Sequence, residues 1–427
     1  SARSKGLWNL AWYGIRKSNL GIENLDRMTE ATQEERNLIE GQLYFFRGWL
    51  HFNLIQYWGG MPYIDRVLPA NEPFRESRLT YQECAERAAE DFRRAADLLP
   101  INWDNTVAGR RTAGRNHFRI NKIMALSYLG KNLLWASSPL MNKVSGGGES
   151  YNADFARRAA EAFGELLNLV ESGQTQYALE PFNNYKRIFL TRGQNWLLPG
   201  GTETIFRAPV WAANDTHWGV TQGWIPTVIA RDNGSKLSPT ANYVNRNYGM
   251  ANGMPLPEDI SQADPESGYD PNFPFRDRDP RFYHDIAYDG VQMVIGSLTP
   301  ENANRRYANL YTGGNFRDDR NSTRTGYVHM KFMEIGFNNF DQRYSYGNAS
   351  SRSIPYVRLA DIYLMYAEAA LIGYNSVTGQ SPNFSKNAVD AVNTIRDRAG
   401  MPAVLPRFLT SASVFMEDLR RERAVEL

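Results

Sequence analysis

Cysteine is almost absent from this sequence, because Cys84 is the only one among 427 residues. A single thiol excludes a disulfide within the chain and any metal site built from several cysteines. Cys84 falls inside a helical pattern from Thr80 to Leu98, which predicts a buried, inert thiol. Long apolar runs are also missing, since no window approaches the roughly 18 apolar residues that a membrane-spanning helix needs. The sequence therefore predicts no transmembrane helix.

A strong charge of either sign is missing as well. The net charge is +2, and charged residues make up 22% of the chain against 42% hydrophobic residues. This balance predicts a globular protein and gives no electrostatic reason to expect nucleic acid as a partner. There is no signal peptide and no lipidation cysteine near residue 1. Because helical patterns run into both ends, we expect any targeting signal or lipid anchor to lie outside this chain.

The sequence signatures of common enzyme classes do not occur. There is no phosphate-binding loop, dinucleotide fingerprint or zinc-protease motif, and no Gly-x-Ser-x-Gly turn for a nucleophile. The histidines are scattered without the spacing of metal ligands; they are His51, His117, His217, His284 and His329. The sequence thus predicts no catalytic residue, no cofactor and no bound metal.

Two pairs of carboxylates could nevertheless carry chemistry: Asp277 with Asp279, and Asp318 with Asp319. Paired carboxylates serve glycosidases and hold Ca²⁺. Arginines interleave or flank both pairs, in Phe275-Arg-Asp-Arg-Asp-Pro-Arg-Phe282 and in Phe316-Arg-Asp-Asp-Arg-Asn321. We therefore favour local Arg–Asp pairing that orders a loop.

A helix with two apolar faces is predicted at 356–372. One stripe consists of Leu359, Tyr363, Tyr366 and Ala370, and a second stripe lies beside it: Ala360, Leu364, Ala367 and Leu371. Such a helix must lie between other elements. A second helix is predicted at 385–399, because Gly400 and then Pro402 form the expected stop signal. Together they predict a helix hairpin that stacks on other hairpins.

The first 170 residues have the same character. Helices are predicted at 2–27, 32–58, 79–98, 116–136 and 152–170. Thr32 and Glu35 have the spacing of a capping box, and Trp58-Gly-Gly-Met-Pro62 predicts an abrupt helix end. The pattern resembles degenerate tetratricopeptide stacking, although the repeat signature of roughly 34 residues is absent. The predicted fold is therefore mainly α, with stacked tetratricopeptide-like helix hairpins.

A loop-rich region interrupts the helices from Asn195 to Ser353. Its strand candidates are short: 204–208, 292–295 and 327–332. Long irregular regions are usually functional. We therefore predict three segments within one compact fold: helices at 1–175, a loop-rich ligand-binding region at 176–353, and a C-terminal hairpin with a following helix at 354–427.

The positive signal for function is an aromatic stretch in this region. Three indoles, Trp211, Trp218 and Trp224, alternate with short polar residues and glycines. Flat aromatic faces stack on the C–H faces of pyranose rings, while amides and carboxylates bond the hydroxyl groups. The polar candidates are Asn214, Asp215 and His217. The alternative for any one of these Trp residues is that it anchors a long loop to the helices, and this alternative is less favoured for all three together.

Several separated motifs resemble the SusD/RagB family of outer-membrane nutrient-binding lipoproteins of Bacteroidetes. They occur in the family's order: Arg47-Gly-Trp-Leu-His-Phe-Asn-Leu-Ile-Gln-Tyr-Trp-Gly-Gly-Met-Pro62, Leu134-Trp-Ala-Ser-Ser-Pro-Leu-Met-Asn142, Ser238-Pro-Thr with Asn252-Gly253, Arg278-Asp-Pro-Arg-Phe282, Arg358-Leu-Ala-Asp-Ile-Tyr-Leu-Met-Tyr-Ala-Glu-Ala369, Asn393-x-Ile-Arg-x-Arg-Ala-Gly400 and Arg420-Arg-Glu-Arg423. Together they span nearly the whole chain.

The resemblance implies a helical fold whose loops carry the ligand site. It implies a lipid-anchored, surface-exposed outer-membrane protein that captures glycans or peptides, and of these we favour non-catalytic binding of glycans. It also implies a partner, a SusC-like TonB-dependent transporter. On this basis we assign ligand contact to the three tryptophans and their polar neighbours, and we interpret Arg47, Asp361 and Glu368 as buried ion-pair residues.

Other functions stay open at the level of sequence. The same fold could bind peptides or other nutrients, or the stacked helices could serve as a protein-interaction scaffold that works by broad surface burial. A glycosidase is the least favoured option.

Overall fold

The computed structural model describes residues 2–191, 202–207, 225–230, 238–317, 323–333, 335–336, 338–341, 351–352 and 354–427. Residue contacts divide the chain into two units. The first unit comprises residues 1–176 and 362–391, and the second comprises residues 177–361 and 392–427. The three segments expected from the sequence follow chain order instead, and that division stays a prediction.

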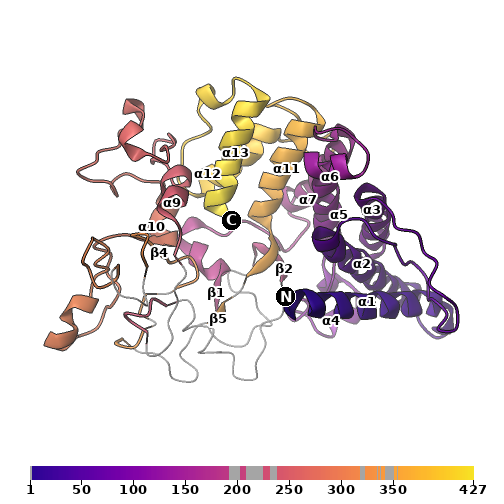
Figure 1. Cartoon of the computed structure of the whole chain (residues 1–427). Coiled ribbons are helices and arrows are strands. Elements are labelled where there is room, and N and C mark those ends of the chain that lie inside the picture. The colour runs from indigo at the N-terminus through magenta and orange to yellow at the C-terminus, as the bar shows by residue number, and fades with distance from the viewer. Residues whose placement is uncertain are drawn as a thin grey trace. The chain divides into compact units, whose positions relative to one another are not determined.

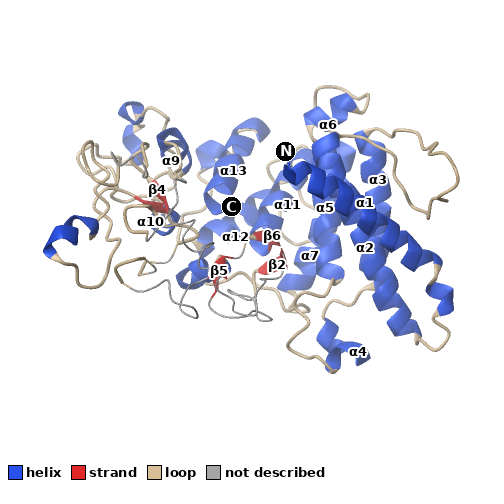
Figure 2. Ribbon diagram, turned by 60° about the horizontal axis from the view of Figure 1, so that its bottom comes forward, coloured by secondary structure: helices blue, strands red, loops and turns tan. Residues whose placement is uncertain are grey.

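Long helices form the body of the first unit. They are α1 (Ala2–Glu23), α2 (Gln33–Trp58), α3 (Tyr81–Leu98), α5 (Lys122–Ser137) and α7 (Ala153–Glu171). Each packs on the next, α1 on α2, α2 on α3, α3 on α5 and α5 on α7, and Figures 1 and 2 show them side by side. The mainly α-helical fold with stacked hairpins is therefore confirmed.

The ends of these helices follow from local chemistry. The Thr32 hydroxyl accepts a hydrogen bond from the Glu35 amide at 3.2 Å, and the Glu35 carboxylate accepts one from the Thr32 amide at 2.9 Å. The predicted capping box is therefore present. Helix α2 ends at Trp58 and is capped by Gly59, whose φ of 72° suits glycine. The helix predicted from residue 116 begins only at Lys122, because the Asn121 side chain caps it through the Met124 amide.

Shorter elements connect the long helices. In the first unit they are η1 (Leu25–Arg27), η2 (Trp103–Asn105), α4 (Val107–Arg110) and α6 (Pro139–Val144). In the second unit they are η3 (Phe182–Ile188), α9 (Ala241–Asn247), η4 (Ile260–Gln262), η5 (Pro265–Ser267), α10 (Pro280–Asp285), η6 (Pro300–Arg305) and η7 (Pro406–Phe408). The second unit ends with the longer helix α13 (Ala412–Glu426).

The apolar helix predicted at 356–372 is α11 (Leu359–Gly373). Every residue from Leu359 to Ala367 is buried, as its two apolar stripes require. Its predicted start was wrong, because Tyr356–Arg358 belong to strand β6 (Pro355–Arg358) instead. The pairing of this strand with a distant segment overrides the local helical pattern. The helix predicted at 385–399 is α12 (Ala388–Arg398).

Strands in the described part of the second unit are short and form antiparallel pairs, drawn in red in Figure 2. Strand β1 (Leu190–Thr191) pairs with β5 (Ser351–Arg352), β2 (Thr204–Arg207) with β6, and β3 (Ile286–Ala287) with β4 (Val328–His329). The strands predicted at 204–208 and 327–332 therefore exist in shorter form.

The strand predicted at 292–295 was wrong. Only Gln292 makes a bridge there, to Tyr307, while Met293 and Val294 are buried in an apolar cluster. A short apolar run indicates that a segment is buried. By itself it does not distinguish a strand from an irregular core segment.

Candidate ligand-binding region

All six predicted ligand residues lie outside the described part of the chain: Trp211, Trp218, Trp224, Asn214, Asp215 and His217. Their role stays a prediction. The structure does describe the residues on both sides of this stretch. Strand β2 precedes it and ends at Arg207, and Ile225–Ala230 follows it. The candidate region is therefore built here from these two anchoring segments, both of which belong to the second unit.

The first anchoring segment is the β2–β6 pair. Thr204 pairs with Arg358, Phe206 with Val357, and Arg207 with Pro355. Ile205 is buried on this short strand, and the rings of Phe206 and Tyr356 lie 5.5 Å apart. The register shifts on both sides of Phe206, so the ladder between these two strands is irregular.

A carboxylate fixes the residue before β2. Glu203 is fully buried, and its two oxygens accept hydrogen bonds from Arg358 Nη1 at 2.6 Å and Arg398 Nη1 at 3.0 Å. The amide of Glu180 donates to the same carboxylate at 3.0 Å. On the backbone, the Glu203 carbonyl accepts from the Leu359 amide at 2.9 Å. Glu203 therefore joins the start of β2 to β6, α11 and α12.

The same two arginines meet a second carboxylate, Glu426 near the end of α13. Arg358 donates to Glu426 Oε1 at 2.7 Å, and Arg398 donates to the same oxygen. The Glu426 carbonyl accepts from Tyr185 at 3.0 Å and from Lys331 at 2.8 Å. Glu426 is completely buried, and it is the point where α13 joins the group.

Arg281 of α10 extends the cluster further. Its guanidinium lies 3.1 Å from Glu426 Oε2 and 2.8 Å from Asp279 Oδ2, and it also pairs with Glu422. We call this set the Glu426 cluster: Glu203, Asp279, Arg281, Lys331, Arg358, Arg398, Glu422 and Glu426. All eight residues lie in the second unit.

Electrostatics inside the cluster favour the charged forms. Burial alone would raise the pKa of Glu426, but Arg398, Arg358 and Arg281 outweigh it and hold that pKa well below its usual range. Burial likewise opposes the charge on Arg358, yet Glu426 and Glu203 raise the pKa of its guanidinium. Each buried charge thus has direct partners, as buried ions require.

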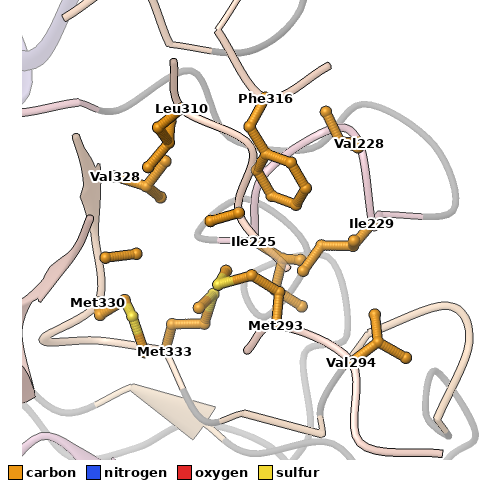
Figure 3. Packing of buried hydrophobic residues seen from close by; sticks show 12 residues of the cluster. Ile225, Val228, Ile229, Met293, Val294, Leu310, Phe316, Val328, Met330 and Met333 are labelled. Carbon is orange, nitrogen blue, oxygen red and sulfur yellow. The ribbon is translucent and has the colours of Figure 1, made fainter. Parts of the chain in front are cut away.

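The second anchoring segment is Ile225–Ala230. Ile225, Val228 and Ile229 are buried in an apolar cluster, whose side chains gather in Figure 3. The other buried members are Ala287, Met293, Val294, Ala308, Leu310, Phe316, Val328, Met330 and Met333. The Ile229 carbonyl also accepts a hydrogen bond from the Asn339 amide at 2.9 Å. The described segments on the two sides of this stretch are therefore held in a strand pair and in a hydrophobic core.

A groove of about 890 Å³ lies elsewhere in the second unit, between α9 and α13. Tyr243 and Phe408 line it together with charged residues that are paired. Arg246 lies 3.5 Å from Glu258 and 3.7 Å from Glu417. The volume of the groove suits a small ligand, but Arg246, Glu258 and Glu417 already form ion pairs with one another.

Groups of side chains that could bind a metal ion are missing from the described residues. No three His, Cys, Asp or Glu side chains there are placed to hold a metal ion. Asp279 pairs with Arg281, as the interpretation of local Arg–Asp pairing predicted, whereas Asp318 and Asp319 lie outside the described part. In the described segments, no helix is both long and apolar enough to cross a membrane.

Of the three predicted ion-pair residues, two are confirmed. Arg47 pairs with Asp91 and Asp361 with Arg423, while the role of Glu368 stays a prediction. Sequence reasoning missed Glu203 and Glu426. The only sequence signal for Glu203 is a carboxylate just before the apolar Thr-Ile-Phe of β2, which is too common to identify a site.

Comparisons with known proteins agree with this architecture. A family model described as "SusD family" matches residues 202–427, and one described as "Starch-binding associating with outer membrane" matches residues 1–115. No curated protein matches the chain.

Solved structures of proteins from Bacteroides and Parabacteroides species share the fold. A SusD-like protein from Bacteroides fragilis has a TM-score of 0.69 at 22% identity, over 99% of this chain and 72% of its own. A SusD-like carbohydrate-binding protein from the same species has a TM-score of 0.67 at 22% identity, over 99% and 70%. A SusD superfamily protein from Parabacteroides distasonis has a TM-score of 0.64 at 18% identity, over 99% and 72%.

The family model covers more than half of the chain, including both anchoring segments and the whole Glu426 cluster. Its match also extends across the stretch that carries the predicted tryptophans. This chain belongs to the SusD family.

Proposed function

We propose that this chain binds oligosaccharides or polysaccharides at the bacterial surface without catalysis and passes them to a SusC-like TonB-dependent transporter in the outer membrane. The observation that carries the proposal is membership of the SusD family, together with a tryptophan-rich stretch between two firmly anchored segments. One matched family model is described as starch-binding and as associating with the outer membrane. A lipid anchor outside this chain would hold the protein at that surface.

In this proposal, Trp211, Trp218 and Trp224 stack on sugar rings. Asn214, Asp215 and His217 bond the hydroxyl groups. Indole faces gain dispersion and hydrophobic contact from the C–H face of a pyranose, and short polar side chains supply orientation. A ligand held by stacking and hydrogen bonds needs no acid, base or nucleophile, which is consistent with the paired state of the described carboxylates in the Glu426 cluster.

A glycan array probed with the purified chain tests the proposal. The array should carry starch fragments beside other plant, host and bacterial glycans, with an arm of immobilised peptides. We expect binding to at least one glycan class and to no peptide. Incubation of the protein with the bound glycan should release no shorter product, which chromatography of the supernatant would show.

A triple substitution and a matched control then test whether the three tryptophans contact the glycan. Replacing Trp211, Trp218 and Trp224 together by alanine should abolish glycan binding in calorimetry while thermal unfolding stays cooperative. The matched control is Trp103, a buried indole of the first unit that donates to the Ile120 carbonyl at 2.7 Å. Trp103→Phe should lower stability and leave glycan affinity unchanged. Unchanged affinity in the triple variant would refute the site assignment.

A further inference from the structure

We propose that Glu203 is a positioning residue for the glycan site proposed above: it fixes the start of strand β2, from which the chain enters the tryptophan stretch. This inference rests on the proposed function for its consequence in binding. Its structural part stands on the described residues of the second unit alone. Glu203 itself does not touch the ligand in this proposal, because its side chain is fully buried.

The strand ladder is too weak to fix β2 by itself. Strand β2 has four residues, and its register against β6 shifts on both sides of Phe206. Short ladders specify register poorly, and a slip by one residue turns every side chain to the opposite face. A slip would therefore turn Ile205 to the opposite face of the strand and displace the buried side chains of Thr204 and Arg207.

Contacts of Glu203 fix the register that the β2–β6 ladder alone leaves poorly specified. Both carboxylate oxygens and the carbonyl of this residue are engaged, by Arg358, Arg398 and Leu359. Arg358 is also the β6 residue that pairs with Thr204. The charge contact and the backbone pairing therefore act on neighbouring positions of the same two strands, and only one register satisfies both.

Glu426 holds the two arginines in place. It accepts hydrogen bonds from Arg358 and Arg398 on one oxygen, so neither guanidinium can follow Glu203 if β2 slips. The ring of Tyr185 lies 5.2 Å from the Arg398 guanidinium, and that of Phe189 lies 5.5 Å from Arg358. The arginines are thus fixed on several sides, and the position of Glu203 is determined by them.

Energetics favour positioning over stabilisation as the role of this cluster. Buried ion pairs add little net stability compared with a well-packed apolar core, because desolvation offsets their attraction. Misplacing one member of such a pair leaves charges buried and unpaired, which penalises any other arrangement. The contacts of Glu203 with Arg358 and Arg398, next to a four-residue strand, are therefore better explained by control of register.

Hydrogen exchange measured by mass spectrometry tests the structural part without any ligand. In Glu203→Gln, which keeps the side-chain volume, amides of residues 202–207 should exchange at least tenfold faster. Amides of α9 in the same unit should be unchanged, because their helix does not depend on β2. Equal acceleration in both segments, or in neither, would overturn the positioning role.

The glycan array tests the consequence for binding. Signals of Glu203→Gln should fall about tenfold on every glycan that the unmodified chain binds, since apparent affinity falls with the fraction of molecules in the competent state. The stability control is Asp91→Asn, which breaks the buried Arg47–Asp91 pair of the first unit and should leave all signals unchanged. Equal loss in both variants would show a purely structural effect and overturn the inference.

The experiments distinguish an error in the positioning role of Glu203 from an error in the proposed glycan binding. If the unmodified chain binds no glycan, the proposed function fails, and hydrogen exchange still decides the role of Glu203. If the triple tryptophan variant loses binding while Glu203→Gln keeps it, only the positioning role fails. Should Glu203→Gln not fold, Arg398→Lys replaces it. This variant keeps the charge but loses the two-pronged contact with Glu203 and Glu426, and it should reduce the signals two- to threefold.

Discussion

Arg47 on α2 and Asp91 on α3 form a two-point ion pair inside the first unit. The Nε–Oδ2 distance is 2.8 Å and the Nη2–Oδ1 distance is 2.5 Å. Tyr63 donates to the same carboxylate at 2.6 Å, and Arg47 also donates to Asn19 at 3.1 Å. One buried arginine therefore joins α1, α2 and α3 and the loop that follows α2.

Breaking this pair should destabilise the chain strongly. Asp91→Ala leaves a guanidinium buried without its counter-charge, which costs about 3 to 5 kcal/mol of unfolding free energy. Asp97→Ala on the same helix is the control, because its partner Arg93 is partly exposed, and we expect a loss of about 0.5 kcal/mol. Urea denaturation followed by circular dichroism measures both. Similar losses in the two variants would contradict the assigned role.

Adding a methyl group between α5 and α7 should also destabilise the chain. A Cβ atom at Gly130 would overlap the ring of Phe163, which is fully buried. Gly130→Ala should therefore cost about 1 to 3 kcal/mol, even though alanine favours helix by about 1 kcal/mol.

Two further variants make this explanation specific. At Gly6 on α1 an added Cβ meets no atom within 4 Å, so Gly6→Ala should be neutral or slightly stabilising. Phe163→Leu should recover part of the loss in Gly130→Ala, because contacting sites are not additive. If the double variant shows only the sum of the single losses, overlap with Phe163 is not the cause.

Acid should weaken the fold through His51. Its Nδ1 lies 2.9 Å from the Arg47 carbonyl, and its Nε2 accepts from the Ile64 amide at 3.1 Å. These partners fix the neutral ring with the proton on Nδ1, since a proton on Nε2 would face another N–H. Burial is the main cause that lowers the pKa of His51 to about 3, from an ordinary value of 6.5.

The sign of the effect follows from these two values. The unfolded chain binds the proton first, so the contribution of His51 to stability is complete above about pH 6.5 and is lost as the pH falls toward 3. Between pH 7 and pH 4.5 we expect about 2 to 3 kcal/mol of loss from this residue. In His51→Gln this loss should vanish, so the stability gap to the unmodified chain should narrow by that amount in urea titrations. A gap independent of pH would contradict the prediction.

The single thiol should be unreactive in the folded chain. Cys84 is fully buried, and its Sγ donates to the Met61 carbonyl at 3.1 Å. Burial raises the pKa of the thiol, which lowers the fraction of reactive thiolate. Ellman's reagent should therefore detect no thiol at neutral pH in buffer and one thiol per chain in denaturant. Rapid labelling without denaturant would show that α3 opens locally.

Much of the helical half could be predicted from sequence, because its signals are local. The 3.6-residue period of apolar residues and the Thr32–Glu35 capping box act within one or two turns. The predicted range of α2 differs from the observed one by a single residue. Errors arose where a local signal competed with a distant one, as at Tyr356, where pairing with β2 begins a strand in place of a helix.

The position of the candidate ligand region along the chain could be predicted from the sequence, but its three-dimensional contacts could not. The tryptophans at 211, 218 and 224 mark it by composition, because stacking on sugars needs only the residue type. The sequence does not indicate which acidic residue forms an ion pair with which arginine. Arg358 pairs with Glu203 across 155 positions and with Glu426 across 68.

Most helices, their caps, the near-neutral charge and the family motifs could be predicted from the sequence, since each depends on neighbours within a few residues or on residue type. The partners of Glu203 and Glu426, the start of α11 and the burial of Ile225, Val228 and Ile229 in an apolar core became visible only in the folded chain. The physical reason is that ion pairing and core packing act over a few ångströms in space, whatever the separation along the chain.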